Sequence, residues 1–304
     1  LLLASATRTD ALGGAGFWAD DYANIGAFPA SVNNHNVAWT NGDDFTSVWN
    51  VDGTTWGFAG GSGDDMANVW WGNGDMGVNF GLGMSPEVVA ADDTMNCGDD
   101  GASTCVAEAN TALNVGFGMD LAGMDFGFNY GDDGTIGINL RRAQDIWLFE
   151  NVLVNFGMLM EEKTDGAITT ASNMGLAAHL YKTTNYASGT SGLFALGFNY
   201  GDAGKSSDTG VDPDATMGIE WNFAVESAMT DWATLRVGYS KAHDFGGGTN
   251  AGGAVVMGLG FNYGSFDLDM NLNSYGAMLN DPVKYVTGRN NAALGAGWTI
   301  TYNW

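Results

Sequence analysis

The chain has 304 residues, which is enough for one large domain or two ordinary ones. It carries 35 acidic and 10 basic residues, a net charge of −25, and this excludes nucleic acid as a partner because a phosphate backbone would be repelled. Hydrophobic residues make up 45% and charged residues only 15%, a composition that argues against a disordered chain. The acidic excess is typical either of a cation-attracting surface or lumen or of a solubilising exterior.

No run of about 18 apolar residues occurs, so the sequence predicts no transmembrane helix. A membrane protein of this kind must then be a closed β-barrel, because only closure satisfies every backbone polar group in lipid. The first residues, Leu1–Ala6, read LLLASA and are typical of the end of a signal peptide with an Ala-x-Ala cleavage site, or they belong to the mature chain. Both export and an outer-membrane location are expected on this basis.

Residues 7–32 are rich in glycine and alanine and show no sustained alternation. This composition without alternation predicts a loose N-terminal arm or a segment folded into a barrel lumen. We therefore expect two parts, an arm or luminal plug over residues 1–32 and a transmembrane barrel over residues 33–304.

This arm resembles the N-terminal signature of the FadL/OmpP1/PorV group of outer-membrane barrels. The matching positions are Leu12 to Gly16, Asp20, Asp21, Asn24, Pro29 and Ala30. Phe28 departs from the pattern, since the group usually carries Asn before Pro-Ala. The resemblance implies a barrel, usually of 14 strands, whose N-terminal segment often sits inside it, and transport of hydrophobic molecules.

From Asn36 onward, segments of about ten residues alternate between apolar and small polar side chains. In the last of them, Leu294, Trp298 and Trp304 fall on the apolar file, and Gly297 and Thr299 fall on the polar file. This period of two predicts strands with lipid on one side and water on the other. The fold class is therefore all-β, a transmembrane antiparallel barrel, with a soluble sandwich as the alternative.

The number of alternating segments predicts about 14 strands, or about 16 if Asn36–Thr40 and Phe45–Trp49 form a first hairpin. Connections are predicted to be long at one end and short at the other, as in outer-membrane barrels, with both termini periplasmic. The predicted long connections are Ser85–Glu108, Asp202–Pro213, Asp244–Gly252 and Ser274–Asn291, and the short ones are Gly72–Gly74, Asp120–Ala122, Arg142–Asp145, Met229–Asp231 and Tyr263–Ser265. The predicted connection Lys182–Ser191 falls at the end with short connections but is longer than the others there.

Two kinds of loop feature stand out. Cys97 and Cys105 are the only cysteines, and in an exported chain such a close pair predicts a disulfide, with two free thiols as the alternative. The acidic loops Asp92–Asp100 and Asp208–Asp214 could bind Ca²⁺ through clustered carboxylates or simply be solvated. No other cofactor is expected.

The pentapeptide Gly-Phe-Asn-Tyr-Gly occurs three times, beginning at Gly127, Gly197 and Gly260. Its rings fall on the apolar file at a strand end, which favours an aromatic girdle at the membrane interface over a sugar-binding role. The predicted girdle residues are Tyr130, Tyr200, Tyr263, Trp298 and Trp304.

The polar file carries charged residues that predict a lumen lining: Asp125, Arg141, His179, Glu220, Glu226, Arg236, Asp267 and Asp269. Acidic and basic groups facing each other across a water-filled bore select solutes by charge and size. The alternative is that these charges pair with one another or with the arm. His179 is a remote candidate for a hydrolase site, but the common enzyme motifs are missing and we expect no enzyme.

Three functions follow as hypotheses. The first is a porin-like channel for passive diffusion of small hydrophilic or cationic solutes. The second is a structural barrel with a plugged lumen that acts through partners or self-assembly, and homo-oligomers are compatible with either. The third, implied by the resemblance, is a FadL-like transporter of hydrophobic molecules, although the polar file of Asn, Gly, Asp and Thr disfavours an apolar pocket.

Overall fold

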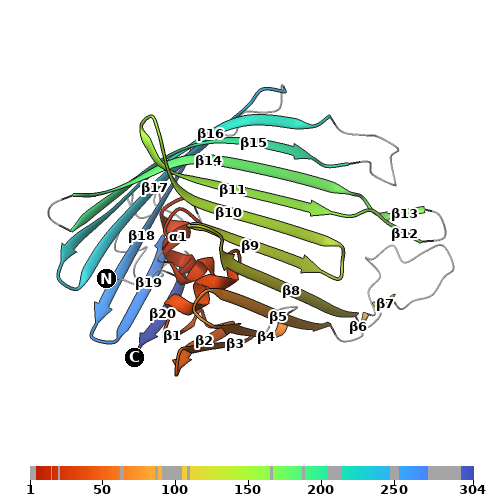
Figure 1. Cartoon of the computed structure of the whole chain (residues 1–304), viewed down its shortest axis with the longest axis horizontal. Coiled ribbons are helices and arrows are strands. Elements are labelled where there is room, and N and C mark those ends of the chain that lie inside the picture. The colour runs from red at the N-terminus through yellow and green to blue at the C-terminus, as the bar shows by residue number, and fades with distance from the viewer. Residues whose placement is uncertain are drawn as a thin grey trace.

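The structure is a computed structural model. It describes residues 5–14, 16–19, 21–61, 65–85, 88–90, 105–107, 110–164, 167–186, 189–204, 214–246, 253–272 and 296–304. Within these ranges sixteen antiparallel strands form one closed barrel (Figure 1), in which β1 pairs with β20 to complete the ring. The preferred prediction of about 14 strands was therefore wrong. The two extra strands are the short first hairpin, β1 (Val37–Thr40) and β2 (Asp44–Val51), which sequence analysis held open as the alternative.

The remaining barrel strands follow one another around the ring in chain order. They are β3 (Thr54–Gly61), β4 (Asp65–Gly72), β5 (Met76–Ser85), β8 (Asn110–Asp120), β9 (Met124–Gly131), β10 (Thr135–Ile146), β11 (Phe149–Leu159), β14 (Asn173–Tyr186), β15 (Thr190–Asp202), β16 (Thr216–Thr230), β17 (Ala233–Asp244), β18 (Ala254–Tyr263), β19 (Phe266–Leu272) and β20 (Ala296–Asn303). Two small hairpins, β6 (Val88–Ala90) with β7 (Cys105–Ala107) and β12 (Glu162–Thr164) with β13 (Ala167–Thr170), lie outside the ring.

The longest connections fall at one end of the barrel, as predicted, but that end also has the three-residue turns 41–43 and 132–134. At the opposite end, here called the short-turn end, strands are joined by the two- or three-residue turns 52–53, 73–75, 121–123, 147–148, 231–232 and 264–265, and three residues separate β14 from β15 there. The four predicted long connections all fall at the other end, here called the long-loop end, and most of their residues lie outside the described ranges. Asp92–Asp100 and nearly all of Asp208–Asp214, the predicted Ca²⁺ loops, lie outside them too, as does Cys97 of the predicted disulfide.

Two predicted turn positions change. Arg142–Asp145 is not a turn, because β10 runs on to Ile146 and absorbs an irregularity between Ala143 and Ile146 as a bulge. The reversal falls at Trp147, whose φ of 53° supplies the left-handed conformation of a tight turn. The long connection at Lys182–Ser191 shrinks to residues 187–189, because β14 and β15 pair as far as Tyr186 and Thr190.

The outer file of the strands is apolar and exposed. Phe80 is 50%, Phe223 48% and Ile300 40% exposed, whereas the neighbouring Thr299 and Thr301 are 3% and 0% exposed. Alternation along β20 therefore separates an apolar outer file from a polar inner file, as the period of two predicted.

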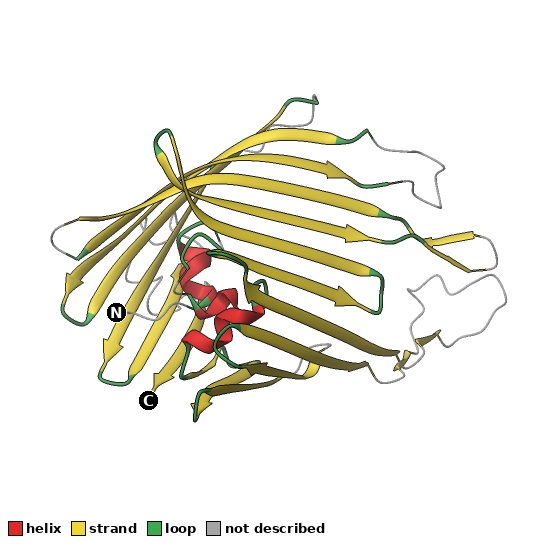
Figure 2. Ribbon diagram, viewed as in Figure 1, coloured by secondary structure: helices red, strands yellow, loops and turns green. Residues whose placement is uncertain are grey.

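Inside the ring of strands lies a helical segment, residues 5–35, here called the N-terminal arm (Figure 2). It contains α1 (Ala6–Ala11) and the 3-10 helices η1 (Tyr22–Ile25) and η2 (Pro29–Asn34). Ser5 caps α1 by accepting a hydrogen bond from the Arg8 N–H at 3.1 Å, and Asp21 caps η1 in the same way. Among the described residues, no helix is long and apolar enough to cross a membrane.

Candidate functional site

The candidate site is the inner face of the barrel together with the arm that lies against it. The arm touches strands around most of the ring: α1 contacts β17 to β20, and η2 contacts β3, β4, β5, β8 and β9. These contacts are made by glycines, by a hydrophobic cluster and by a buried network of charges.

Glycines on the inner file let the arm backbone approach the strands. A Cβ atom added at Gly127 of β9 would lie 1.9 Å from the Ala27 carbonyl oxygen, and one added at Gly118 of β8 would lie 2.6 Å from the Ala30 nitrogen. On the other side of the ring, a Cβ at Gly238 of β17 would lie 2.5 Å from the Leu12 carbonyl carbon. Any other residue at these positions would force the arm away from the wall, so glycine is required there for close approach.

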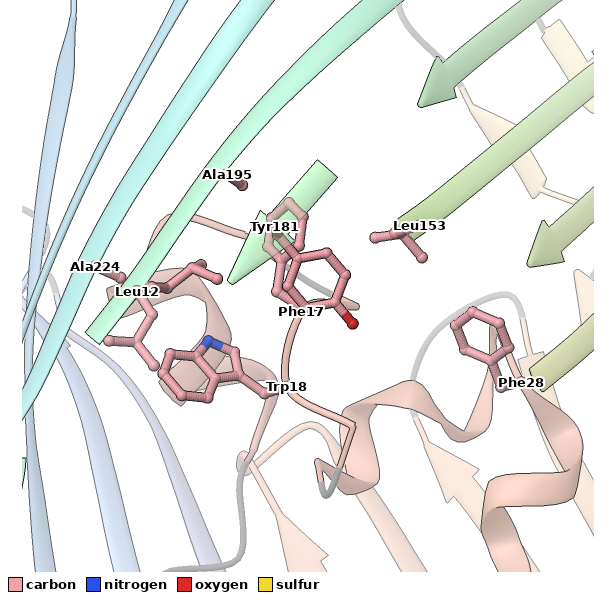
Figure 3. Packing of buried hydrophobic residues seen from close by; sticks show 9 residues of the cluster. Leu12, Phe17, Trp18, Phe28, Leu153, Tyr181, Ala195 and Ala224 are labelled. Atoms are coloured by element: carbon pink, nitrogen blue, oxygen red, sulfur yellow. The ribbon is translucent and has the colours of Figure 1, made fainter. Parts of the chain in front are cut away.

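The arm also contributes a large part of the apolar core. Leu12, Phe17, Trp18 and Phe28 of the arm pack with inner residues of β11, β14, β15 and β16 (Figure 3), namely Leu153, Tyr181, Leu193, Ala195 and Ala224. A second cluster joins Tyr22, Ile25 and Val32 to Val37 of β1 and Val48 of β2. The inner face is therefore not uniformly polar, which strict alternation did not predict.

A network of buried charges holds α1 to the wall. Arg8 donates to Glu226 from Nε at 2.7 Å and from Nη2 at 3.0 Å, and Arg236 donates to the same carboxylate from Nε at 2.7 Å. Arg236 also donates to Asp269 at 2.5 Å, and Asp269 accepts from the Ser5 hydroxyl at 2.6 Å. The side chains of Arg8, Arg236 and Asp269 are 5% exposed or less. We call these five residues the anchoring network.

Hydroxyl and amide groups tie the rest of the arm to the strands. The Thr7 and Tyr22 hydroxyls lie 2.7 and 2.6 Å from those of Thr299 and Thr301 on β20. At the far side, Asn33 donates to the Met76 carbonyl at 3.0 Å. Burial raises the pKa of the Tyr22 hydroxyl above its usual range, so this group stays protonated.

The eight predicted lining residues all lie on strands of the barrel and form pairs with close neighbours. Asp125 accepts from Arg141 at 2.8 Å, Glu220 is paired with His179, and Asp267 accepts from Asn262 at 2.7 Å and from Asn303 at 2.8 Å. Glu226, Arg236 and Asp269 belong to the anchoring network. The charges that alternation placed on one face are thus brought together in local groups, and their role in lining a pore stays a prediction.

The five predicted girdle residues lie on the outer file at both ends. Tyr263 and Trp304, 87% and 50% exposed, are at the short-turn end, and Tyr130 and Trp298, 40% and 38% exposed, are at the long-loop end. Tyr200 is partly exposed near the long-loop end of β15. Contact of these rings with lipid stays a prediction.

Sequence analysis missed several contributors, among them Arg8, Leu193 and Ala195. Arg8 is one of only 10 basic residues, and this scarcity in a Gly/Ala-rich arm was a signal for a specific acidic partner. Leu193 and Ala195 lie on the inner file of β15, where Leu193–Leu196 breaks the alternation with four apolar residues in a row. Such a break indicates an inner surface that something apolar covers.

Cavities lie on both sides of the arm. Toward the long-loop end, one of about 590 Å³ is lined by Tyr22, Trp39 and Asp44 among others, and one of about 510 Å³ is lined by Asn79, Asn114 and Asn129 among others. A cavity of about 610 Å³ at the short-turn end is lined by Arg8, Trp18, Tyr186 and Glu226 among others. The arm therefore narrows the interior without filling it.

Comparison with known proteins gives no family. No family model matches the chain, and no curated protein matches it. Among solved structures, a mutant of the porin of Rh. blastica is 12% identical, covering 86% of this chain and 89% of the porin, with a TM-score of 0.37. OmpT, an outer membrane protein of Vibrio cholerae, is 11% identical, covering 99% of this chain and 74% of the OmpT chain, with a TM-score of 0.28. The translocator domain of the autotransporter NalP from Neisseria meningitidis is 13% identical, covering 88% of this chain and 84% of the domain, with a TM-score of 0.24. Likenesses of this strength assign no function to the chain.

Proposed function

We propose that the protein is a porin-like channel of a bacterial outer membrane, through which small hydrophilic solutes, neutral or cationic, diffuse passively. In this proposal residues 33–304 carry the transmembrane barrel, whose first strand begins at Val37, and residues 1–32 carry most of the N-terminal arm that narrows the passage. The observation that carries it is the closed barrel with an exposed apolar outer file and with cavities between the arm and an inner face of mixed polarity.

The outer file supports the membrane location. Large apolar side chains such as Phe80, Phe223 and Ile300 are exposed around the ring, and a continuous apolar surface of this kind is unfavourable in water but favourable against hydrocarbon. The short turns at one end fit the periplasmic side of such barrels, and the aromatic side chains Tyr263 and Trp304 at that end fit a lipid interface.

Conductance in planar bilayers tests the channel. We expect the full-length protein to pass ions in small steps, because the arm leaves cavities beside it, and a variant lacking residues 5–35 to give larger steps. If neither protein conducts under any condition, the channel proposal fails.

A second candidate is a barrel that the arm keeps closed and that acts through partners or self-assembly. The buried anchoring network and the glycine contacts favour it, because they hold the arm against the wall on both sides. Conductance that appears only after removal of the arm would select this candidate. A FadL-like transporter of hydrophobic molecules is disfavoured by the four asparagines that line the cavity of about 510 Å³, Asn68, Asn79, Asn114 and Asn129.

A further inference from the structure

Two cavities at the long-loop side of the arm lie next to each other. The cavities of about 590 and 510 Å³ share Gly26, Asn68 and Trp70 in their lining. Each falls in the size range of small-molecule sites in proteins. The wall that carries Asn68 and Trp70 is the inner face of β4, β5, β8 and β9; it lines the smaller cavity, and only its β4 part also lines the larger one.

Strand register arranges this wall in two rows. In the first row Trp70, Asn79, Gly116 and Asn129 are successive cross-strand partners on β4, β5, β8 and β9. The second row has Asn68, Gly81, Asn114 and Gly131 at the corresponding places. Asparagine and glycine therefore alternate along and across the wall, which we call the amide–tryptophan surface (Asn68, Trp70, Asn79, Asn114 and Asn129).

The glycines leave notches into which the amides turn. A Cβ atom at Gly116 would lie 2.1 Å from Asn79 Oδ1 and 2.7 Å from Asn129 Oδ1. A Cβ at Gly81 would lie 2.2 Å from Asn68 Oδ1 and 2.3 Å from Asn114 Oδ1. The four amides thus converge in two pairs across a strand, and each amide offers both donors and acceptors.

Part of this hydrogen-bonding capacity is unused. Asn79 is only 8% exposed, and within the described part of the chain its Oδ1 has no hydrogen-bond partner. The indole Nε1 of Trp70, its cross-strand neighbour, is likewise buried without a partner among the described residues. Buried polar atoms usually have partners, so an acceptor and a donor side by side point to a ligand that supplies both.

The described part of the lining carries no positive charge, which disfavours an anionic ligand. No arginine or lysine is among the described residues that line the two cavities, so an anion finds no counter-charge there. The two acidic residues are already engaged locally, because Asp133 accepts from the Thr135 N–H and hydroxyl at 2.8 and 2.7 Å and Asp44 accepts from Asn41 at 3.4 Å. No group of three or more metal-ligating side chains occurs in the described ranges.

Aromatic rings complete the surface. Trp70 lines both cavities, and Trp39 and Tyr22, whose ring centroids are 4.4 Å apart, line the larger one. Ring faces carry a negative quadrupole and an apolar surface, which suit the C–H faces of a ring-shaped solute, while the amides suit its hydroxyl groups.

We propose that the amide–tryptophan surface is a binding subsite for uncharged polyhydroxylated solutes, the chemical class of saccharides and polyols. The proposal deepens the channel function and rests on it for the route by which the solute arrives, but binding itself requires only the folded barrel.

Calorimetric titration of the detergent-solubilised full-length protein tests the subsite, with maltose as the neutral probe and protonated glucosamine and gluconate as charged probes. We expect maltose to bind and the charged probes to bind more weakly. Asn79→Ala should weaken maltose binding about tenfold, the effect of losing one hydrogen bond to a buried group. The matched control is Asn155→Ala, which removes an amide that donates to Asn139 at 2.7 Å and lines neither cavity, and it should leave the affinity unchanged.

Gly116→Ala is the second variant, because its methyl group displaces the Asn79 and Asn129 amides without deleting either, and it should weaken maltose binding as well. Absence of maltose binding to the wild type, tighter binding of glucosamine than of maltose, or equal weakening by Asn155→Ala and Asn79→Ala would each overturn the subsite. Conductance without maltose binding would remove the subsite alone, whereas maltose binding without conductance would remove the channel and leave the subsite standing.

Discussion

Glu226 accepts hydrogen bonds from two arginines, one on the arm and one on the wall, and this shared carboxylate is the centre of the anchoring network. We expect Arg8→Gln to lower the free energy of local opening of α1 by about 2 kcal/mol. The variant loses two charge-assisted hydrogen bonds to the nearly buried Glu226 carboxylate, while the bond from Arg236 remains. Hydrogen exchange of the α1 amides should then be roughly thirtyfold faster.

A surface ion pair provides the control for this variant. Lys182 Nζ lies 2.5 Å from Glu150 Oε1, but the two side chains are 41% and 48% exposed, so solvent screens the pair. Lys182→Gln should leave exchange in α1 unchanged. Equal exchange in the wild type and in Arg8→Gln would show that the network does not hold the arm.

The Tyr22 hydroxyl gives the arm a pH dependence. Burial raises its pKa in the folded protein, whereas an unfolded tyrosine ionises near pH 10. The unfolded state therefore releases a proton that the folded state keeps, so stability is full below about pH 10 and falls as the pH rises above it.

Tyr22→Phe should remove this alkaline loss of stability, and at neutral pH it should cost about 1 kcal/mol for the bond to Thr301. Urea unfolding of both proteins between pH 8 and pH 11 measures the difference. Parallel pH profiles for the two proteins would rule out Tyr22 as the source.

At the level of strands and helices, the glycines of the inner file decide whether the arm can dock. Gly127→Ala should displace residues 27–30 from β9, since the new methyl group would meet the Ala27 carbonyl, which is backbone and cannot rotate away. Protease cleavage within the arm should become faster, and the conductance step should become larger.

Gly157→Ala is the matched control, because Gly157 lies within β11 and nothing lies within 4 Å of the added atom. It should behave as the wild type in both measurements. Faster cleavage in both variants would mean that general loosening of the barrel, and not the contact at Gly127, exposes the arm.

The elements differ in how far their sequences determine them. The long strands follow from a period of two, since alternate apolar and small polar residues fit two different environments in only one way. Helices α1, η1 and η2 could not be predicted, because the Gly/Ala-rich arm has no helical period and owes its conformation to Leu12, Phe17 and Phe28 packing on the wall. The first hairpin was undercounted because β1 has only four residues.

The site was predicted in its composition but not in its pairing. Alternation identified Glu226, Arg236 and Asp269 as inner residues, because successive side chains of a strand point to opposite faces and the sequence alone shows which positions share a face. Their partners Arg8 and Ser5 lie more than 200 positions away in sequence, and such contacts are set by tertiary docking alone.

For the whole molecule, the net charge of −25 sets the expected selectivity. We expect a channel that prefers K⁺ over Cl⁻, measured as the reversal potential across a salt gradient in planar bilayers, because an acidic protein raises the local concentration of cations.

The preference for K⁺ should persist near 0.1 M salt, where the field of a charge extends over a Debye length of about 10 Å. It should shrink when the same ratio of concentrations is set near 1 M salt, because the Debye length there is only about 3 Å. Anion preference at low salt would contradict the role given to the acidic residues.

The ring closes through β1 and β20, which share four residue pairs, a number as small as that between β1 and β2 and smaller than that between any other neighbouring barrel strands described here. Tyr22 bridges that join from inside, since its ring lies against Trp39 of β1 and its hydroxyl reaches Thr301 of β20. Sideways parting of the first and last strands would therefore require the arm to detach beforehand. In the proposed channel, a docked arm would therefore keep a solute from leaving through the wall at this join, and we expect its route to run along the barrel axis.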